Sequence, residues 1–164
     1  MLYFAYGSNM ATARLRQRIP SAHRIGVARL DGYRLAFQVA STKDGSGKCD
    51  ACPATASDQL FGVLFRIDPA AKTILDHYEG VGIEYRDTWL TVEPEQGNQV
   101  KALIYLGINI DRNLRPYPWY REHVLRGAIE NQLPEDYIAS IRAVPTMDDP
   151  DPERATRELS IYLN

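Results

Sequence analysis

The stretch Tyr6-Gly7-Ser8-Asn9 is the first part of the chain whose residue types could do chemistry. It ends a short apolar segment, Leu2 to Tyr6, which is rich in aromatic residues, lacks helical spacing and is predicted to be a buried strand. The glycine permits a sharp turn, and the serine or the asparagine can cap a helix predicted from Met10 to about Arg18. A helix that begins there directs unpaired backbone N–H groups into the adjoining crevice. The turn therefore suits a carboxylate or a developing oxyanion, although it is also ordinary turn chemistry that needs no ligand.

Glu79 is the acid that could complete such a site. It ends a helix that is predicted to begin at Asp68-Pro69, with Gly80 as a natural C-terminal stop. The negative end of the helix dipole opposes a second negative charge, so we expect a raised pKa for this carboxyl and a base that works nearer neutral pH. On the sequence alone, a solvent-facing glutamate at a helix end is the alternative.

Two further groups of residues could do chemistry, and both give weaker signals. Cys49 and Cys52 form a Cys-x-x-Cys pair, which is compatible with a redox pair or with half of a zinc site. The zinc site would need two more ligands, and paired ligand spacing is lacking for the histidines, which are His23, His77 and His123. Pro53 favours a strand after Cys52, so we interpret the cysteines as fortuitous and expect no metal. Glu84 could pair with Glu79 as in a glycosidase, but nothing in the sequence fixes their separation.

The composition indicates one globular domain. The chain has 164 residues, of which 45% are hydrophobic and 24% are charged, and no apolar run approaches the roughly 18 residues of a membrane span. The first residues lack a basic flank, so we expect no signal peptide, no membrane association and a cytoplasmic location. A formal net charge of -2 gives no support for nucleic-acid binding, and we interpret Arg14, Arg16 and Arg18 as a solvated helix face.

The elements that position these residues are predicted from hydrophobic periodicity and turn signals. Arg24 to Leu30 and Tyr33 to Ala40 are predicted strands, joined as a hairpin through Asp31-Gly32. Ser41 to Asp50 is rich in Gly, Ser, Lys and Asp, and we expect a mobile surface loop that could serve as a lid. Leu60 to Ile67 is the most apolar run and is predicted to be a central strand.

The second half of the chain is predicted to contain strands and then helices. The strands are Tyr85–Val92 and Val100–Leu106, and the helices are Tyr120–Asn131 and Glu135 to about Ala143. Helical spacing predicts buried positions in the helix before Gly80 and in the first of these helices, namely Ile74, Leu75, Tyr78, Val124, Leu125, Ala128 and Ile129. Met147 to Glu153 is expected to be a solvated linker, and the last residues a strand or a helix. We therefore expect one domain over residues 1–147, followed by an acidic linker and C-terminal tail over 148–164.

Two segments together resemble the signatures of the gamma-glutamylcyclotransferase family, also called AIG2-like. The first is Tyr6-Gly7-Ser8-Asn9 after an apolar strand, and the second is His77-Tyr78-Glu79-Gly80-Val81 with Tyr85 after it. The order and spacing of further segments agree over roughly residues 2–149, namely Gly26–Leu30, Tyr33–Phe37, Gly62–Phe65, Tyr105, Pro116–Tyr120 and Gly127 through Leu133-Pro134 to Tyr137. Asn9-Met10-Ala11 differs from the glutathione-specific branch, in which we expect a Leu in place of Asn9 and a Trp soon after. The chain therefore resembles the branch that takes gamma-glutamyl amino acids or gamma-glutamyl amines.

The resemblance implies an α+β fold in which a mixed sheet closes into a small β-barrel flanked by helices. It implies release of 5-oxoproline by attack of the substrate's alpha-amine on its own gamma-carbonyl, with Glu79 as general acid/base. Substrate contacts are expected from the backbone N–H groups of the N-terminal turn and from tyrosine walls, which together are Tyr6, Gly7, Ser8, Asn9, Tyr85 and Tyr117 or Tyr120. No cofactor or metal is implied, the partner is a small-molecule gamma-glutamyl substrate, and we expect a monomer or a homodimer.

The main alternative is a non-catalytic domain that keeps this fold and binds a small molecule or a partner through the same turn. Loss of the glutamate would favour that alternative, and this chain retains Glu79. A thiol oxidoreductase built on Cys49 and Cys52 and the glycosidase-like pair are further alternatives. The sequence does not fix the leaving amino acid or amine.

Overall fold

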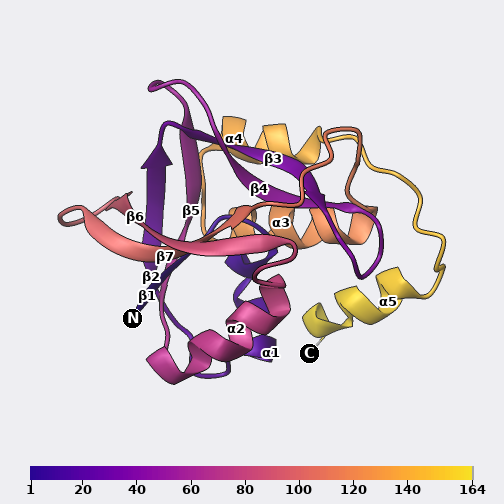
Figure 1. The fold of residues 1–164 in the computed structure, drawn as a ribbon, viewed down its shortest axis with the longest axis horizontal. Coiled ribbons are helices and arrows are strands. Elements are labelled where there is room, and N and C mark those ends of the chain that lie inside the picture. Colours follow the sequence, from indigo (N-terminus) through magenta and orange to yellow (C-terminus); the bar gives the residue numbers. More distant parts are fainter. Residues whose placement is uncertain (164) are drawn as a thin grey trace.

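Two sheets form the β structure of residues 1–163, the part of the chain that the computed structural model describes. The larger sheet is a closed barrel whose strands, in spatial order, are β1 (Leu2–Ala5), β5 (Gln59–Arg66), β2 (His23–Asp31), β6 (Tyr85–Pro94) and β7 (Val100–Gly107). The smaller sheet pairs β3 (Tyr33–Ala40) with β4 (Gly47–Pro53). Because β1 is antiparallel to β5 but parallel to β7, the barrel is mixed (Figure 1). The α+β barrel fold that the resemblance implied is confirmed.

Five α-helices flank the sheets in the described residues: α1 (Thr12–Arg18), α2 (Lys72–Glu79), α3 (Pro118–Glu130), α4 (Glu135–Arg142) and α5 (Arg154–Leu159). Short 3-10 turns precede α1 and α2 and follow α5, at Ser8–Met10, Pro69–Ala71 and Ser160–Tyr162. Figure 1 shows α3 and α4 beside the small sheet, α1 and α2 below the barrel, and α5 at the end of a long connection. Within residues 1–163, none of these helices combines the length and the apolar character that crossing a membrane requires.

The barrel core is built around β5. Its consecutive side chains Val63, Leu64 and Phe65 are all buried, so both faces of the strand are covered. A strand of this kind shows a continuous apolar run rather than alternation, which is the pattern of the sequence here. β5 pairs with β1 on one side and with β2 on the other, and the predicted central strand is confirmed.

The predicted hairpin through Asp31-Gly32 is wrong, although both of its strands are present. β2 pairs with β5 and β6 in the barrel, whereas β3 pairs with β4 in the small sheet. The backbone N–H of Gly32 donates to the carbonyl of Asp58 (2.9 Å), and the carbonyl of Gly32 accepts from the N–H of Ala54 (2.8 Å). Gly32 is therefore bonded to the connection that leads into β5, and long-range strand pairing overrides the local turn preference.

The predicted surface loop over Ser41 to Asp50 is wrong in its second half, because β4 begins at Gly47. The turn that remains is held by Asp44. Its carboxylate accepts from the backbone N–H of Ser46 (3.0 Å) and from Nζ of Lys48 (2.6 Å). These bonds give the β3–β4 turn a defined shape beside the cavity described below.

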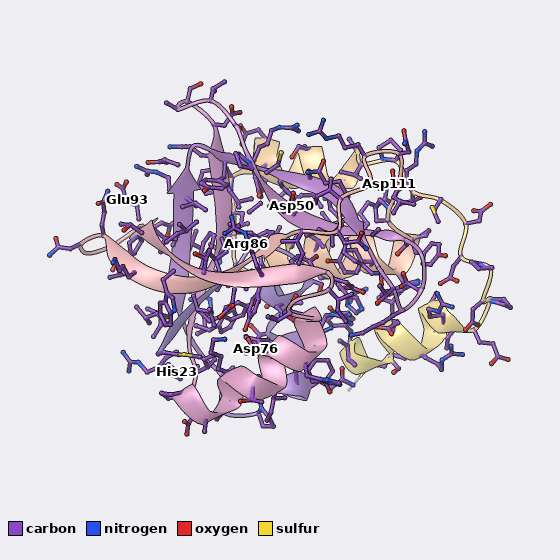
Figure 2. All side chains as sticks on the ribbon, in the orientation of Figure 1. His23, Asp50, Asp76, Arg86, Glu93 and Asp111 are labelled. Atoms are coloured by element: carbon purple, nitrogen blue, oxygen red, sulfur yellow. The ribbon has the colours of Figure 1, made fainter. Side chains whose placement is uncertain are left out.

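Asp50, labelled in Figure 2, fastens the small sheet to the barrel. Its carboxylate accepts from Nε2 of Gln38 (2.8 Å) and from the backbone N–H of Gly107 at the end of β7 (2.9 Å). A buried carboxylate needs such donors, since burying an unpaired charge is costly. The small sheet is therefore fixed against one end of the barrel.

The predicted cap of the first helix is wrong. A 3-10 turn covers Ser8–Met10, and α1 begins only at Thr12, with Ala11 as its N-cap and no side-chain cap. The side chain of Asn9 is committed elsewhere, because its Nδ2 donates to the hydroxyl of Tyr3 (3.0 Å) and to Glu79 (2.9 Å). A long-range contact therefore replaces the local capping bond.

The helix α2 ends at Gly80 as predicted, in the left-handed region with a φ of 62°, but it begins at Lys72. The predicted start at Asp68-Pro69 is instead that of the preceding 3-10 turn, Pro69–Ala71, where Oδ1 of Asp68 accepts from the N–H of Ala70 (2.8 Å). The predicted buried side of α2 is only partly correct, since Leu75 is buried but Ile74 and Tyr78 are 49% and 40% exposed. Ile129 of α3 is also exposed, at 48%. A helix that lies against the end of a barrel buries a narrower stripe than helical spacing alone suggests.

The described residues of the C-terminal tail, 148–163, fold back onto the helices. Nε1 of Trp119 donates to the carboxylate of Asp149 (2.7 Å), and Arg14 pairs with Glu158 (2.9 Å). The last element is helical, as one of the two predicted alternatives had it. The expected solvated linker is thus anchored to α3 through Asp149, and the tail reaches α1.

Gly62 of β5 gives a test of this core. A Cβ at Gly62 would overlap the carbonyl oxygen of Ala5 and lie 2.7 Å from the ring of Phe4, which is packed inside the barrel. We therefore expect Gly62→Ala to lower the free energy of unfolding by about 1–3 kcal/mol in urea denaturation. The matched control is Gly26→Ala on β2, where an added Cβ meets no atom within 4 Å and should change stability by less than about 0.5 kcal/mol. Equal effects of the two substitutions would contradict the packing of β1 against β5.

Candidate active site

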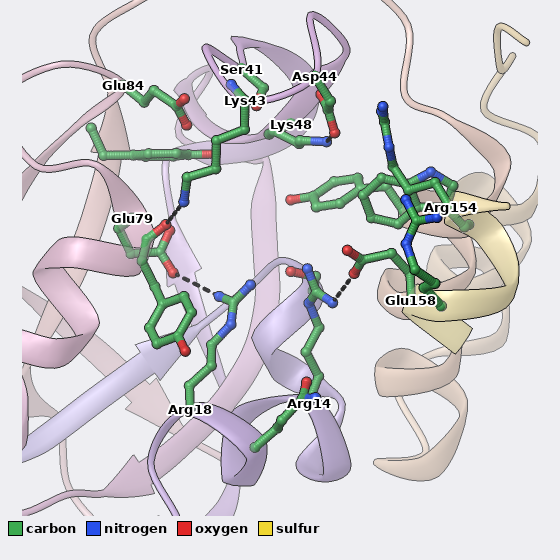
Figure 3. Close-up of a pocket in the computed structure, with 17 residues that line it drawn as sticks. Arg14, Arg18, Ser41, Lys43, Asp44, Lys48, Glu79, Glu84, Arg154 and Glu158 are labelled. Carbon is green, nitrogen blue, oxygen red and sulfur yellow. Dashed lines mark hydrogen bonds and ion pairs between the residues drawn. The ribbon is translucent and has the colours of Figure 1, made fainter. Parts of the chain in front are cut away.

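Two adjoining cavities lie where β1, the end of α2 and the start of α3 meet. The inner one, of about 30 Å³, is lined by Tyr3, Tyr6, Gly7, Ser8, Asn9, Cys49, Glu79, Tyr85, Tyr105 and Tyr120. The outer one, of about 530 Å³ and drawn in Figure 3, is lined mainly by polar and charged side chains. Residues that line both are Ser8, Glu79, Tyr85 and Tyr120. Glu79 therefore lies at the boundary between a small tyrosine-walled cavity and a large charged one.

The carboxyl of Glu79 is held from α1 and from the N-terminal turn. Its side chain is 15% exposed, its Oε1 accepts from Nδ2 of Asn9 (2.9 Å), and the same oxygen lies 3.7 Å from Nη1 of Arg18. Burial raises the pKa of Glu79, while the positive charges of Arg18, Arg14 and Lys43 act in the opposite direction. Burial is thus the largest cause of the raised pKa. The pKa of this carboxyl therefore lies above its ordinary value.

The N-terminal turn presents backbone donors to the inner cavity. The carbonyls of Gly7 and Ser8 accept from Met10 (3.0 Å) and Ala11 (3.3 Å) within the 3-10 turn. Among the described residues, no hydrogen-bond partner is found for the N–H groups of Gly7, Ser8 or Asn9. These N–H groups belong to a 3-10 turn and its N-cap instead of the expected helix start, and the residues that carry them line the same cavity as Glu79.

The predicted tyrosines differ in their placement. Tyr6, Tyr85 and Tyr120 line the inner cavity, whereas Tyr117 lines neither cavity. The hydroxyl of Tyr85 donates to the carbonyl of Cys49 (2.6 Å), and that of Tyr120 accepts from the N–H of the same residue (3.2 Å). Burial raises the pKa of Tyr6, Tyr85 and Tyr120. These rings therefore form neutral walls whose orientation is fixed by backbone groups.

Sequence reasoning missed the cations of the outer cavity. Arg14 and Arg18 of α1 both line it, so their interpretation as a solvated face is wrong; of the three arginines, Arg16 is the exposed one. Because Arg14 and Arg18 are four residues apart, they lie on one face of the helix, and Arg16 lies on the other. Lys43, from the β3–β4 turn, reaches the end of α2, where its Nζ donates to the carbonyl of Tyr78 (3.0 Å; Figure 3). The four-residue spacing of Arg14 and Arg18 could have indicated that they share a helix face. No feature of the sequence around Lys43 indicates that it lines the cavity.

The C-terminal tail contributes a wall that the sequence did not predict as part of the site. Arg154, Arg157 and Glu158 line the outer cavity. Glu158 pairs with Nη1 of Arg14 (2.9 Å), and the same Nη1 lies 2.9 Å from Nε2 of His123. Because a guanidinium only donates, Nε2 of His123 must accept, and its Nδ1–H is then the donor to the hydroxyl of Tyr162 (2.6 Å). A neutral, buried histidine therefore joins α1, α3 and the tail.

The other sequence candidates do not assemble into a second site. Cys49 is buried and Cys52 is half-buried, and both are free thiols; residues three apart on one strand point to opposite faces. Burial raises the pKa of the Cys49 thiol to about 12, which disfavours the reactive thiolate. Oε1 of Glu84 accepts from both the N–H and the hydroxyl of Thr42, each at 2.6 Å. These bonds give Glu84 a role in holding the β3–β4 turn.

Comparison with known proteins agrees with this geometry. A family model described as the AIG2-like family matches residues 59–141. The chain is 33% identical over 148 residues to gamma-glutamylcyclotransferase of Mus musculus, covering 87% of this chain and 78% of the relative. It is 32% identical over 152 residues to the enzyme of the same name from Homo sapiens, covering 90% and 80%. A solved structure titled gamma-glutamyl cyclotransferase superposes with a TM-score of 0.88 at 29% identity, covering 100% of this chain and 99% of that chain.

A closed mixed barrel with an acid at the boundary of two cavities defines a class of small α+β proteins. Within that class, the chain belongs to the gamma-glutamylcyclotransferase, or AIG2-like, family. The family named from the two sequence motifs is thereby confirmed.

His123 gives a pH test of the tail's anchorage. Burial lowers its pKa to about 4 from an ordinary value of 6.5, so the folded state holds it neutral where the unfolded state takes up a proton. The contribution of His123 to the free energy of unfolding should therefore be fully present above pH 6.5. It should be lost as the pH drops toward 4, by up to about 3 kcal/mol. His123→Gln should flatten this part of the unfolding free energy against pH, whereas the exposed His77→Gln should not. Identical slopes for the two variants would contradict a neutral, buried His123.

Proposed function

We propose that this protein is a gamma-glutamylcyclotransferase, which releases 5-oxoproline from a gamma-glutamyl amino acid or amine. The observation that carries the proposal is one acid, Glu79, in the same inner cavity as the unpartnered N–H groups of residues 7–9. Such a pair supplies the two functions that acyl transfer needs, a proton carrier and a donor set for a negative oxygen. The names of the similar mouse and human proteins support the same activity.

The proposed reaction needs no protein nucleophile. Glu79 removes a proton from the substrate's alpha-ammonium, and the freed amine attacks the gamma-carbonyl carbon of the same molecule. The new C–N bond closes a five-membered ring, and the carbonyl oxygen becomes negative. The bond to the leaving nitrogen then breaks. Glu79 carries two protons, one after the other, from the attacking nitrogen to the departing one, so that the products are 5-oxoproline and an ammonium ion.

The N-terminal turn is proposed to bind the negative groups of the substrate. The N–H groups of Gly7, Ser8 and Asn9 can donate to the alpha-carboxylate or to the oxygen that becomes negative. Gly7 lies so close to β4 that a Cβ would be 2.9 Å from the Cβ of Cys49, so a side chain there would displace the turn. Tyr6, Tyr85 and Tyr120 are proposed to enclose the curled glutamyl chain, which favours ring closure by restricting its conformations.

The outer cavity is proposed to receive the leaving group. The inner cavity, at about 30 Å³, has room for only about two water molecules, so a substrate must extend past Glu79 into the larger space. Within residues 1–163, Lys43 is the basic residue of that space with no carboxylate partner in an ion pair. A leaving amino acid carries a carboxylate that could pair with this lysine, whereas a simple amine does not.

Glu79→Gln tests the proposed base. The amide keeps the shape of the side chain but cannot take up a proton, so turnover should fall by about 100- to 10000-fold while folding and 5-oxoproline binding persist. The measurement is release of 5-oxoproline from gamma-glutamyl dipeptides, alongside thermal unfolding and product binding by calorimetry. Glu95→Gln, at an exposed position between β6 and β7, is the matched control and should behave as the wild type. Wild-type turnover by the Glu79→Gln variant on every accepted substrate would remove Glu79 from the mechanism. A wild-type protein that binds 5-oxoproline but turns over no gamma-glutamyl dipeptide would favour a binding domain.

Lys43→Met tests the proposed leaving-group contact. We expect KM to rise about 10-fold for a gamma-glutamyl amino acid, the loss of one charge-assisted hydrogen bond, and to stay unchanged for a gamma-glutamyl amine. Initial rates with an alanine and an ethylamine conjugate give the comparison. An equal change in KM for both substrates would contradict recognition of the carboxylate by Lys43.

A further inference from the structure

The side chain of Arg18 is linked to Glu79, the proposed base, mainly through Asn9. Arg18 is hydrogen-bonded to Asn9, and Asn9 is hydrogen-bonded to Glu79. Nη1 of Arg18 donates to Oδ1 of Asn9 (3.0 Å), and it is farther, 3.7 Å, from Oε1 of Glu79. The side chain is 15% exposed, and its guanidinium lies over the ring of Tyr78, 4.8 Å from the ring centre. Arg18, the last residue of α1, therefore contacts the N-terminal turn through Asn9 and the end of α2 through Tyr78. Figure 3 shows its guanidinium pointing toward Glu79.

The donor chemistry of Arg18 fixes the orientation of the Asn9 amide. A guanidinium has no acceptor, so the atom of Asn9 that faces it must be the carbonyl oxygen Oδ1. The NH2 group then points the other way, where its two hydrogens reach the hydroxyl of Tyr3 (3.0 Å) and Oε1 of Glu79 (2.9 Å). Without Arg18, a rotated amide would place its oxygen against the carboxylate of Glu79. Arg18 therefore selects the one orientation that binds the ionised acid.

The two oxygens of Glu79 are unequal as a result. Oε1 holds the bond from Asn9 and the nearby charge of Arg18, whereas Oε2 takes part in no hydrogen bond among residues 1–163. We propose that Arg18 is a positioning residue, which orients Asn9 so that Oε1 of Glu79 is held and Oε2 faces the substrate proton. The effect of Arg18 on catalysis rests on the proposed function. The effect of Arg18 on the orientation of Asn9 and Glu79 does not.

The charge of Arg18 acts together with the rest of the surroundings of Glu79. Burial raises the pKa of Glu79, and of the positive charges that lower it Arg18 has the largest effect, followed by Arg14 from the same helix and Lys43 from the β3–β4 turn. The carboxylate of Glu84 lines the outer cavity and is bonded to Thr42. The remaining titratable groups around the inner cavity are tyrosines and a cysteine, which are ordinarily neutral at pH 7 and whose pKa burial raises further, namely Tyr3, Tyr6, Cys49, Tyr85, Tyr105 and Tyr120. Removing the charge of Arg18 should therefore raise the pKa of Glu79.

The test compares Arg18→Met with Arg18→Lys and with Arg16→Met, which makes the same change on the exposed face of α1. For Arg18→Met we expect kcat at pH 7 to fall about 10- to 100-fold with KM within about two-fold, since the base is displaced but the substrate contacts are not. The acidic limb of kcat against pH should move up by about 1 unit. Arg18→Lys keeps the charge, so it should restore most of the limb's position, and Arg16→Met should match the wild type.

A second readout needs no turnover. The titration of the Glu79 side chain, followed by NMR of its ¹³C-labelled carboxyl group, should move to higher pH in Arg18→Met and stay near the wild type in Arg18→Lys. If Arg18→Met does not fold, Arg18→Gln supplies the neutral variant for both measurements. A wild-type limb and wild-type kcat in the neutral variant, or a loss confined to KM, would overturn the positioning role. A shifted NMR titration in a protein that releases no 5-oxoproline would instead uphold the positioning of Glu79 and refute the proposed function.

Discussion

Placing an ionisable carboxyl inside the protein, at the negative end of a helix, is the constraint on which the site depends. Burial and the helix end both disfavour the charged form of Glu79, and an isolated buried carboxylate would simply hold its proton. The surroundings oppose this with one hydrogen bond from Asn9 and with the charges of Arg18, Arg14 and Lys43. Burial therefore makes the carboxyl more basic, and the nearby cations favour its ionised form. The role proposed for Glu79 as a proton carrier requires both influences.

The fold supplies these groups from segments that are distant in sequence. Asn9 and Glu79 are 70 residues apart, yet β1 and α2 bring them to 2.9 Å at the mouth of the barrel. The closed barrel fixes the exit of β1, and Asp50 holds the small sheet, with its Lys43-bearing turn, against β7. The tail completes the outer cavity through the contact of Glu158 with Arg14. A single packed core therefore sets every distance around the carboxyl.

The local signals in the sequence were sufficient for every strand except β4, for the end of α2 at Gly80 and for the family, because each is carried by neighbouring residues. They failed where a distant partner decides the structure. Gly32 is bonded to the connection before β5, so the hairpin does not form, and Asn9 reaches Glu79 instead of capping α1. The spacing of Arg14 and Arg18 showed a shared helix face but not that the face is buried. The roles assigned to Glu79 and to the turn at residues 7–9 stay predictions, although the structure brings them into one cavity.

The central claim is that the nucleophile belongs to the substrate and that Glu79 only moves its protons. The most direct test is to incubate the protein with a gamma-glutamyl dipeptide in water enriched in oxygen-18 and to identify the products by mass spectrometry. Ring closure by the substrate's own amine predicts 5-oxoproline without label, together with the free amino acid. Glutamate that carries oxygen-18 in its gamma-carboxylate would show attack by water and would contradict the account.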